Sequence, residues 1–225
     1  MRNQIAGILF LSLALCAQGT PVITPSSQTN GTNSLSHTFV PSTTDLLNGL
    51  TASAQSGIFT QEGTGGTSVL TDGQFPSPIT RDAGGAFQFS AFATGGNTGG
   101  TSVTFTLGVA RPITRIDVFG GWQDGGRDQQ NYSILYATAA APTVFLPLTS
   151  VDFNPPDPGG LPQVTKVSIT DTTGTLASNV AALRFDFGAT ENGYSGYAEI
   201  DVIPEPGGLG IFGLAGVGLL GRRRR

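Results

Sequence analysis

Short segments in which apolar and polar residues alternate with a period of two are the feature that most restricts the fold of this 225-residue chain. Successive side chains of a strand point to opposite sides, so this alternation is typical of strands with one buried and one exposed face. No long amphipathic helical pattern separates the segments. We therefore expect antiparallel strands at residues 87–91, 103–107, 116–118, 132–136, 167–169 and 183–187.

Clusters of Gly, Pro, Asn and Asp punctuate these segments and favour turns. Short strands, frequent turns and phenylalanines on one face favour an all-β domain, an antiparallel β-sandwich or jelly roll. Residues 20–44 are rich in Ser, Thr, Asn and Pro, which predicts an extended polar lead-in whose early part packs poorly. The sandwich is then expected over residues 45–202.

The first 19 residues have the pattern of a secretory signal peptide. A positive start at Arg2 precedes an apolar run over residues 5–15, and small residues flank a cleavage point that leaves Thr20 as the first mature residue. Cys16 offers the alternative of a lipoprotein cysteine, but Leu15 before it is larger than the residue expected there. Without Cys16 the chain has no thiol for disulfides or metal binding, so its stability must come from a packed core.

The last 23 residues, 203–225, contain a Pro-Glu-Pro tripeptide, an apolar segment at 207–221 and four arginines. As a helix, the apolar segment is about 22 Å long, less than a hydrocarbon core of about 30 Å. Its seven glycines also lower its helix propensity. Terminal arginines stay on the cytoplasmic side, so we expect a C-terminal hydrophobic helix that inserts transiently and keeps the upstream chain outside.

This order of features resembles the PEP-CTERM sorting signal of exported proteins of Gram-negative bacteria. The resemblance implies that an exosortase removes the tail and passes the protein to the cell surface or the extracellular polysaccharide matrix. Before removal, the chain would be anchored in the inner membrane with its body in the periplasm. The alternative is a permanent single-pass anchor of the same topology. The matching residues are Pro204, Glu205, Pro206, Arg222, Arg223, Arg224 and Arg225.

The charge of the expected mature body restricts its partners. Five of the eleven basic residues lie in the two targeting segments, so six basic side chains face fifteen acidic ones, a formal charge of −9. A body this acidic is repelled by nucleic acid and by anionic lipid surfaces. Cations and neutral ligands are the expected partners.

The residues that common catalytic sites require are scarce. The chain has one histidine, His37, and no Gly-x-Ser-x-Gly element, which argues against a serine hydrolase and against zinc. Carboxylates suited to glycoside hydrolysis are present, but their spacing singles out no pair. We expect a protein that is not an enzyme, with a glycoside hydrolase as the alternative. The carboxylates in question are Asp124, Asp128, Asp186 and Glu191.

Several stretches of the body resemble the discoidin, or galactose-binding-like, jelly roll of coagulation factor type C domains and carbohydrate-binding modules. The similarity extends over residues 45–202, although no tryptophan follows the early Asp72-Gly73 loop as the family pattern has it. The stretches that carry it are 69–73, 113–122, 132–137, 180–187 and 197–202.

This resemblance implies two sites. Members hold a structural calcium ion where the early Asp-Gly loop meets the glutamate of the last strand, which corresponds here to Asp72 and Glu199. The alternative is that Asp72 forms a turn and Glu199 is an exposed strand residue. Sugar-binding members use loops at one end of the sandwich. The corresponding candidates are Trp122, Asp124, Arg127, Asn192 and Tyr194.

Two of these candidates have a second interpretation. Trp122 follows a strand-like segment and is also suited to close the core. Arg127 lies between Asp124 and Asp128, which favours a local ion pair. The sequence therefore favours an exported surface or matrix protein with weak carbohydrate binding. A polysaccharide hydrolase or a purely structural matrix protein is the alternative.

Overall fold

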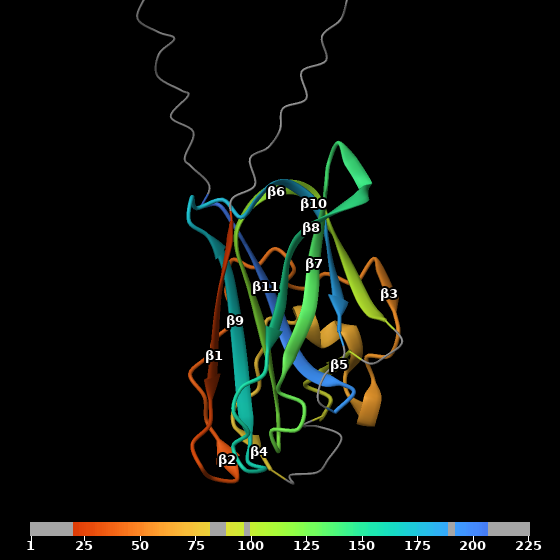
Figure 1. The fold of residues 1–225 in the computed structure, drawn as a ribbon. Helices are drawn as coiled ribbons and strands as arrows, with labels where there is room; N and C mark the ends of the chain where they lie inside the picture. The colour runs from red at the N-terminus through yellow and green to blue at the C-terminus, as the bar shows by residue number, and fades with distance from the viewer. Residues whose placement is uncertain (1–19, 82–88, 97–99, 189–191, 207–225) are drawn as a thin grey trace, which may run out of the picture.

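The computed structural model describes residues 20–81, 89–96, 100–188 and 192–206. These residues form an antiparallel β-sandwich with two short 3-10 helices, which confirms the expected fold class (Figure 1). The elements are β1 (Pro21–Gln28), β2 (Ser34–Leu35), β3 (Ala54–Ser56), η1 (Gln61–Gly63), η2 (Gly66–Thr71), β4 (Ile79–Thr80), β5 (Ala93–Gly95), β6 (Thr101–Trp122), β7 (Gln130–Thr138), β8 (Ala141–Phe153), β9 (Gln163–Asp171), β10 (Ala177–Phe187) and β11 (Ser195–Pro204).

Strand β6 connects the two layers of the sandwich. Its first arm, 101–106, pairs with β10, and its second arm, 113–122, pairs with β9 and β11. The residues between the arms arch over one end of the molecule (Figure 1). Layer one is therefore β3, the first arm, β10, β7 and β8, and layer two is β1, β9, the second arm, β11 and β5.

The main core fills the space between the layers. Alternate residues of each strand point inward, as the period-two pattern predicts. Layer one contributes Phe105, Ile134 and Phe185, and layer two contributes Val118 and Ile200, all with no solvent exposure. The predicted strands at 103–107, 116–118, 132–136, 167–169 and 183–187 all lie within observed strands.

A second, smaller core covers the outer face of layer two. Residues 33–42 and 72–80 cover this face and place Leu35, Phe75 and Ile79 against Phe119 and Ala198 of β6 and β11. Strand β11 is consequently buried on both faces from Ser195 to Val202.

The early lead-in is extended, as expected, and β1 pairs with β9 along its whole length, from Pro21 opposite Asp171 to Gln28 opposite Val164, while six of its eight residues stay exposed. The strand expected at 87–91 is wrong. Residues 89–91 of the predicted segment 87–91 form no strand, and the local strand is β5 instead. Residues 87 and 88 lie outside the described residues.

The sandwich has two distinct ends (Figure 1). At the terminal end lie the beginning of β1, the arch of β6, the turn between β7 and β8, and Pro206, where the description stops. At the loop end lie the connections 123–129, 154–162 and 192–194.

Truncation of the main core tests this packing. Phe185 has no solvent exposure and contacts the Tyr132 ring edge-on, with centroids 6.3 Å apart. We expect Phe185→Ala to lower the free energy of unfolding by about 3–5 kcal/mol, measured by urea denaturation. The control Val40→Ala removes a side chain that is 76% exposed. It should change the free energy of unfolding by less than about 0.5 kcal/mol. Equal losses in the two variants would contradict the packing.

Candidate functional site

Three carboxylates converge on the outer face of layer two. Glu199 and Asp201 lie two residues apart in β11, so they point to the same side, and Asp45 approaches from the preceding loop. One oxygen of each of the three lies within 4.8 Å of the others. Glu199 and Asp201 have no solvent exposure. We call these three residues the acidic cluster.

Backbone amides hold each carboxylate of the acidic cluster through one oxygen. The amides of Val202 and Leu47 donate to Asp45 Oδ1 at 2.5 and 3.0 Å, and the amides of Gly73 and Gln74 donate to Glu199 Oε2 at 2.8 and 3.2 Å. The amide of Ser42 donates to Asp201 Oδ2 at 2.6 Å. The other oxygens, Asp45 Oδ2, Glu199 Oε1 and Asp201 Oδ1, are buried and have no hydrogen-bond partner among the described residues.

Burial and mutual repulsion oppose ionisation of the acidic cluster. Burial, together with the nearby Asp201, Asp45 and Asp72 carboxylates, raises the pKa of Glu199 to about 9. Burial likewise raises the pKa of Asp201 to about 7 and that of Asp45 to about 6. Without a positive charge among them, these groups hold protons at a pH where ordinary carboxyls are ionised.

Basic side chains near the acidic cluster pair with a fourth carboxylate. Asp117 lies opposite Asp201 across the β6–β11 ladder. Its Oδ2 accepts from Lys166 Nζ at 2.9 Å and from Arg115 Nε at 3.2 Å. Lys166 and Arg115 therefore balance the charge of Asp117, and no ion pair among the described residues reaches the acidic cluster itself.

The donor set of the acidic cluster suits a hard divalent cation. Calcium takes six to eight oxygen ligands at about 2.3–2.6 Å, largely from carboxylates and carbonyls. The three carboxylates are already oriented by backbone hydrogen bonds, one oxygen of each lies within 4.8 Å of the others, and each has one buried oxygen without a hydrogen-bond partner among the described residues. These residues fit a calcium ion.

The predicted pair Asp72 and Glu199 is close but arranged differently. The Asp-Gly loop does meet Glu199, through the amides of Gly73 and Gln74. Glu199 is buried rather than exposed, whereas the exposed Asp72 accepts from the Gln74 amide at 2.9 Å and caps its own turn. Burial raises the pKa of Asp72 as well, and hydrogen bonds with the Gln74 amide and the Glu199 side chain oppose this shift. The prediction of calcium at Asp72 and Glu199 stays a prediction, and sequence reasoning missed Asp45 and Asp201.

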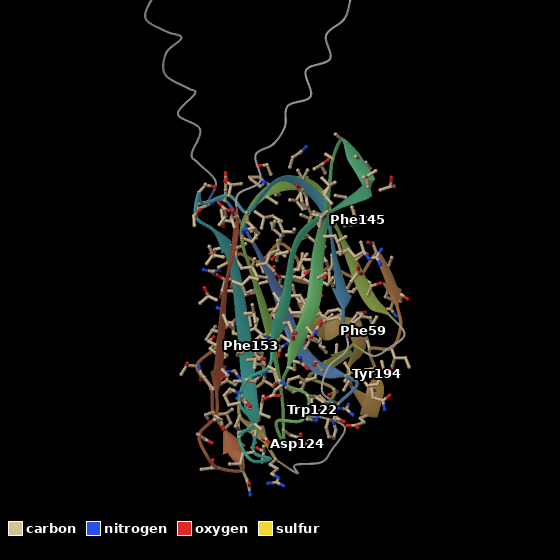
Figure 2. All side chains as sticks on the ribbon, in the orientation of Figure 1. Phe59, Trp122, Asp124, Phe145, Phe153 and Tyr194 are labelled. Carbon is tan, nitrogen blue, oxygen red and sulfur yellow. The ribbon has the colours of Figure 1, made fainter. Side chains whose placement is uncertain are left out.

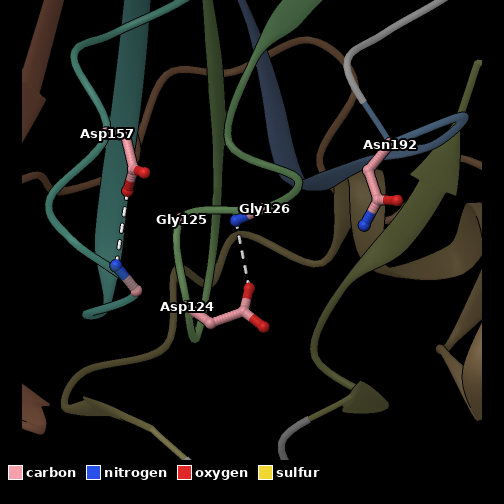
Figure 3. Close-up of a pocket in the computed structure, with 6 residues that line it drawn as sticks. Asp124, Gly125, Gly126, Asp157 and Asn192 are labelled. Atoms are coloured by element: carbon pink, nitrogen blue, oxygen red, sulfur yellow. Dashed lines mark hydrogen bonds between the residues drawn. The ribbon is translucent and has the colours of Figure 1, made fainter.

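A polar pocket of about 240 Å³ lies at the loop end (Figure 3). Asp124, Asp157 and Asn192 come from three different connections and border it. The Gly126 amide donates to Asp124 Oδ1 at 3.0 Å, and the Gly159 amide donates to Asp157 Oδ1 at 2.8 Å. These bonds fix the two carboxylates at the pocket, and the other lining residues include three glycines, Gly125, Gly126 and Gly160. We call this the loop-end pocket.

Trp122 lies beside this region but is buried. Its ring packs at 5.4 Å from Phe89 and 5.6 Å from Phe92, and only 4% of the residue is exposed. A Cβ at Gly196 would lie 2.5 Å from the Trp122 ring, so the indole rests directly on the backbone of β11. Trp122 therefore offers no free ring face to a ligand. It closes the core instead, which was its second interpretation in the sequence.

Arg127 is also part of the interior. Its guanidinium lies 5.2 Å from the Trp122 ring and 5.9 Å from the half-buried Tyr194 ring. It donates to Glu62 Oε1 at 2.6 Å, so the expected local pair with Asp124 or Asp128 is wrong. Figure 2 shows Trp122, Asp124 and Tyr194 at the same end of the sandwich. Of the predicted ligand residues, only Asp124 and Asn192 line the pocket.

The catalytic candidates are dispersed. Asp186 pairs with Arg184 at 2.6 Å on layer one, and Asp128 is buried beside the Gln163 amide. His37 Nε2 is bonded to the Pro76 carbonyl at 2.7 Å, and burial lowers its pKa. Glu191 lies outside the described residues. Asp157, which sequence reasoning missed, is the carboxylate that shares a pocket with Asp124.

The residues of the predicted sorting motif, Pro204, Glu205 and Pro206, lie where the described chain stops. Pro204 pairs with Ile113 of β6, and the Glu205 amide donates to the Pro112 carbonyl at 3.2 Å. The Thr175 hydroxyl bonds the Glu205 carboxylate. Within the described ranges, no helix is long and apolar enough to cross a membrane. The predicted signal peptide, apolar segment and arginines 222–225 lie outside those ranges.

No family model and no curated protein matches this chain. Among solved structures, the lectin domain of lectinolysin complexed with Lewis b antigen is 15% identical, with a TM-score of 0.46 over 73% of this chain and 99% of that one. A chitosan-binding module from a Paenibacillus species is 20% identical, with a TM-score of 0.43 over 70% and 97%. A pectin-binding carbohydrate-binding module is 15% identical, with a TM-score of 0.38 over 71% and 94%.

The raised pKa values predict how the chelated protein responds to pH. The unfolded chain loses protons from these carboxyls near pH 4, whereas the folded chain holds them up to about pH 6, 7 and 9. Between these limits the folded state binds more protons, so its stability should fall as pH rises. We expect a falling melting temperature from about pH 5 to about pH 9 in chelator. The Glu199→Gln/Asp201→Asn variant should flatten this slope, and an unchanged slope would contradict the assignment.

Proposed function

We propose that this chain is an exported surface or matrix protein, sorted through its C-terminal tail, whose sandwich is a non-catalytic, cation-stabilised module for weak carbohydrate binding. The signal-peptide pattern of residues 1–19 and the Pro204-Glu205-Pro206 tail support export and processing by an exosortase. The inner membrane is the transient anchor. The cell surface or the extracellular matrix is the destination.

One observation carries the binding proposal: a polar, glycine-lined pocket lies at the end of the sandwich opposite the point where the chain leaves toward its tail. Carboxylates and amides bond sugar hydroxyls, and the absence of side chains at Gly125 and Gly126 lets a ring approach the backbone. Asp124 and Asp157 disfavour anionic sugars by charge repulsion. Neutral or cationic glycans are the ligands that fit.

The cation has a structural role in this proposal. Asp45, Glu199 and Asp201 would hold a calcium ion and so connect the lead-in turn at Ser42 and the Asp-Gly loop at Gly73 to β11. The ion supplies the positive charge that lets all three carboxyls ionise, the buried Glu199 and Asp201 and the half-buried Asp45. The acidic cluster and the loop-end pocket share no residue, so the ion contributes through stability.

A hydrolase is the second candidate because two carboxylates, Asp124 and Asp157, border one pocket. One would have to act as acid and the other as base or nucleophile. The binding module and the hydrolase differ in a measurable way, because only the hydrolase shortens its ligand. A purely structural matrix protein would do neither.

Glycan retention tests the loop-end pocket. Residues 20–206 are passed over immobilised neutral and amino-sugar polysaccharides, and glycan length is followed in the same samples. We expect retention without cleavage. Asp124→Asn and Asn192→Ala should each weaken retention about tenfold, because each removes hydrogen bonds worth about 1–2 kcal/mol. The matched control Asp186→Asn lies on layer one and should bind as the parent does.

Other outcomes of this assay decide between the alternatives. Release of reducing ends that Asp124→Asn abolishes would establish the hydrolase. If no glycan is retained and none is cleaved, the binding module and the hydrolase are both overturned, and a structural matrix protein remains. Equal losses in Asp124→Asn and Asp186→Asn would place the binding surface elsewhere.

Calcium addition tests the acidic cluster. At a hundredfold excess over the dissociation constant, binding should stabilise the fold by about 2.7 kcal/mol, which corresponds to about 5–10 °C in melting temperature. The gain should be larger at about pH 8 than at about pH 5, because calcium needs the ionised carboxylates. Asp201→Asn should abolish the gain and Asp186→Asn should keep it. Asp72→Asn then reports whether Asp72 is a ligand or only a turn former.

A further inference from the structure

Exposed large apolar side chains gather at the terminal end of the sandwich. In the described part of the chain, seven valine, leucine or isoleucine side chains are exposed, and five of them lie toward this end. Val109 stands on the arch of β6, and Val144 and Leu146 lie near the start of β8. The five are Val22, Ile23, Val109, Val144 and Leu146.

The strand registers place these residues at the same end as Pro206. Val22 pairs with Thr170, which also pairs with Arg115, and Arg115 pairs with Ile203 near the end of β11. On the other layer, β10 joins the arch to the β7–β8 hairpin, because Val180 pairs with both Arg111 and Thr138. Figure 2 shows Phe145 near this end and Asp124 at the opposite one.

Charge is unevenly distributed between the two ends. Exposed acidic side chains, among them Glu62, Asp124, Asp152 and Asp157, lie toward the loop end. The terminal end carries the exposed Arg111 on the arch, Arg115, whose 44% exposed side chain pairs with Asp117, and the exposed Glu205. The body as a whole is acidic, whereas this end presents exposed apolar side chains beside charges of both signs. Exposed apolar side chains of this kind can enter the interface of a lipid bilayer.

The chain leaves little room between this end and a membrane. Glu205 is held to β6 through the Pro112 carbonyl, and the apolar segment 207–221 begins two residues later. Each extended residue spans at most about 3.6 Å. Insertion of that segment would therefore bring the terminal end to the bilayer surface with no linker.

We propose that the terminal end is a membrane-docking surface, on which Val109, Val144 and Leu146 enter the lipid interface beside the inserted tail. The proposal depends on the membrane insertion proposed for the tail. It adds that the sandwich lies against the outer surface of the bilayer in a fixed orientation, with the loop-end pocket directed away. The partner is the lipid surface itself.

Depth-dependent fluorescence quenching tests this orientation. The full-length chain is reconstituted into vesicles of zwitterionic and anionic phospholipids with brominated acyl chains. Native Trp122 is buried at the loop end and gives the baseline. Val144→Trp adds a reporter at the terminal end, and the matched control Ile58→Trp replaces a 46% exposed side chain toward the loop end. We expect the emission added by Val144→Trp to fall at least about twofold, with no loss for Ile58→Trp.

The outcomes separate this proposal from the proposed sorting. If the chain floats with the vesicles and both reporters keep their emission, the tail inserts but the docking surface is wrong. If the chain does not float, the membrane anchor fails, and the docking fails with it. Melting temperatures of both variants check that they fold, and Val109→Trp on the arch serves as a second reporter. Equal quenching of terminal and control reporters would also overturn the orientation.

Discussion

The burial of β11 on both faces is the constraint on which the rest of the structure depends. Its inner face packs Ile200 and Val202 into the main core. Its outer face would expose Glu199 and Asp201 if residues 33–42 and 72–80 did not cover it. Because backbone amides from Ser42, Gly73 and Gln74 bond these two carboxylates, the covering residues are fixed to the strand by hydrogen bonds as well as by apolar contacts.

This arrangement makes the stability of the domain depend on charge compensation. Burying one unpaired carboxylate is costly, and three together cannot ionise without a cation or shared protons. The pKa values of Asp45, Glu199 and Asp201 are raised because burial and mutual repulsion disfavour their charged forms. A calcium ion would remove it and would attach the lead-in to the last strand, in a chain whose only cysteine lies in the predicted signal peptide.

The alternation of apolar and polar residues predicted the strands that have one buried and one exposed face. Strands without this alternation were missed. Strands β7 and β10 have one buried face, and their period-two pattern is clear. Strand β1 contains two prolines and is polar, which an edge strand tolerates. At the site, a family resemblance indicated Glu199, but Asp45 joins it only through tertiary packing. Asp201 was accessible to sequence reasoning, since it lies two residues along the same strand.

The two ends of the sandwich have different proposed roles: the terminal end contacts the membrane, and the loop end binds the glycan. The β6 arch, which joins the layers, also brings Val109 and Arg111 to the end where the described chain stops. The same topology places the polar connections that carry Asp124, Asp157 and Asn192 about one strand length away. A chain held at the first end would present the second to the extracellular matrix. Removal of the tail would then release the apolar end from the membrane without altering the pocket, because the apolar side chains and the pocket residues lie at opposite ends of the sandwich.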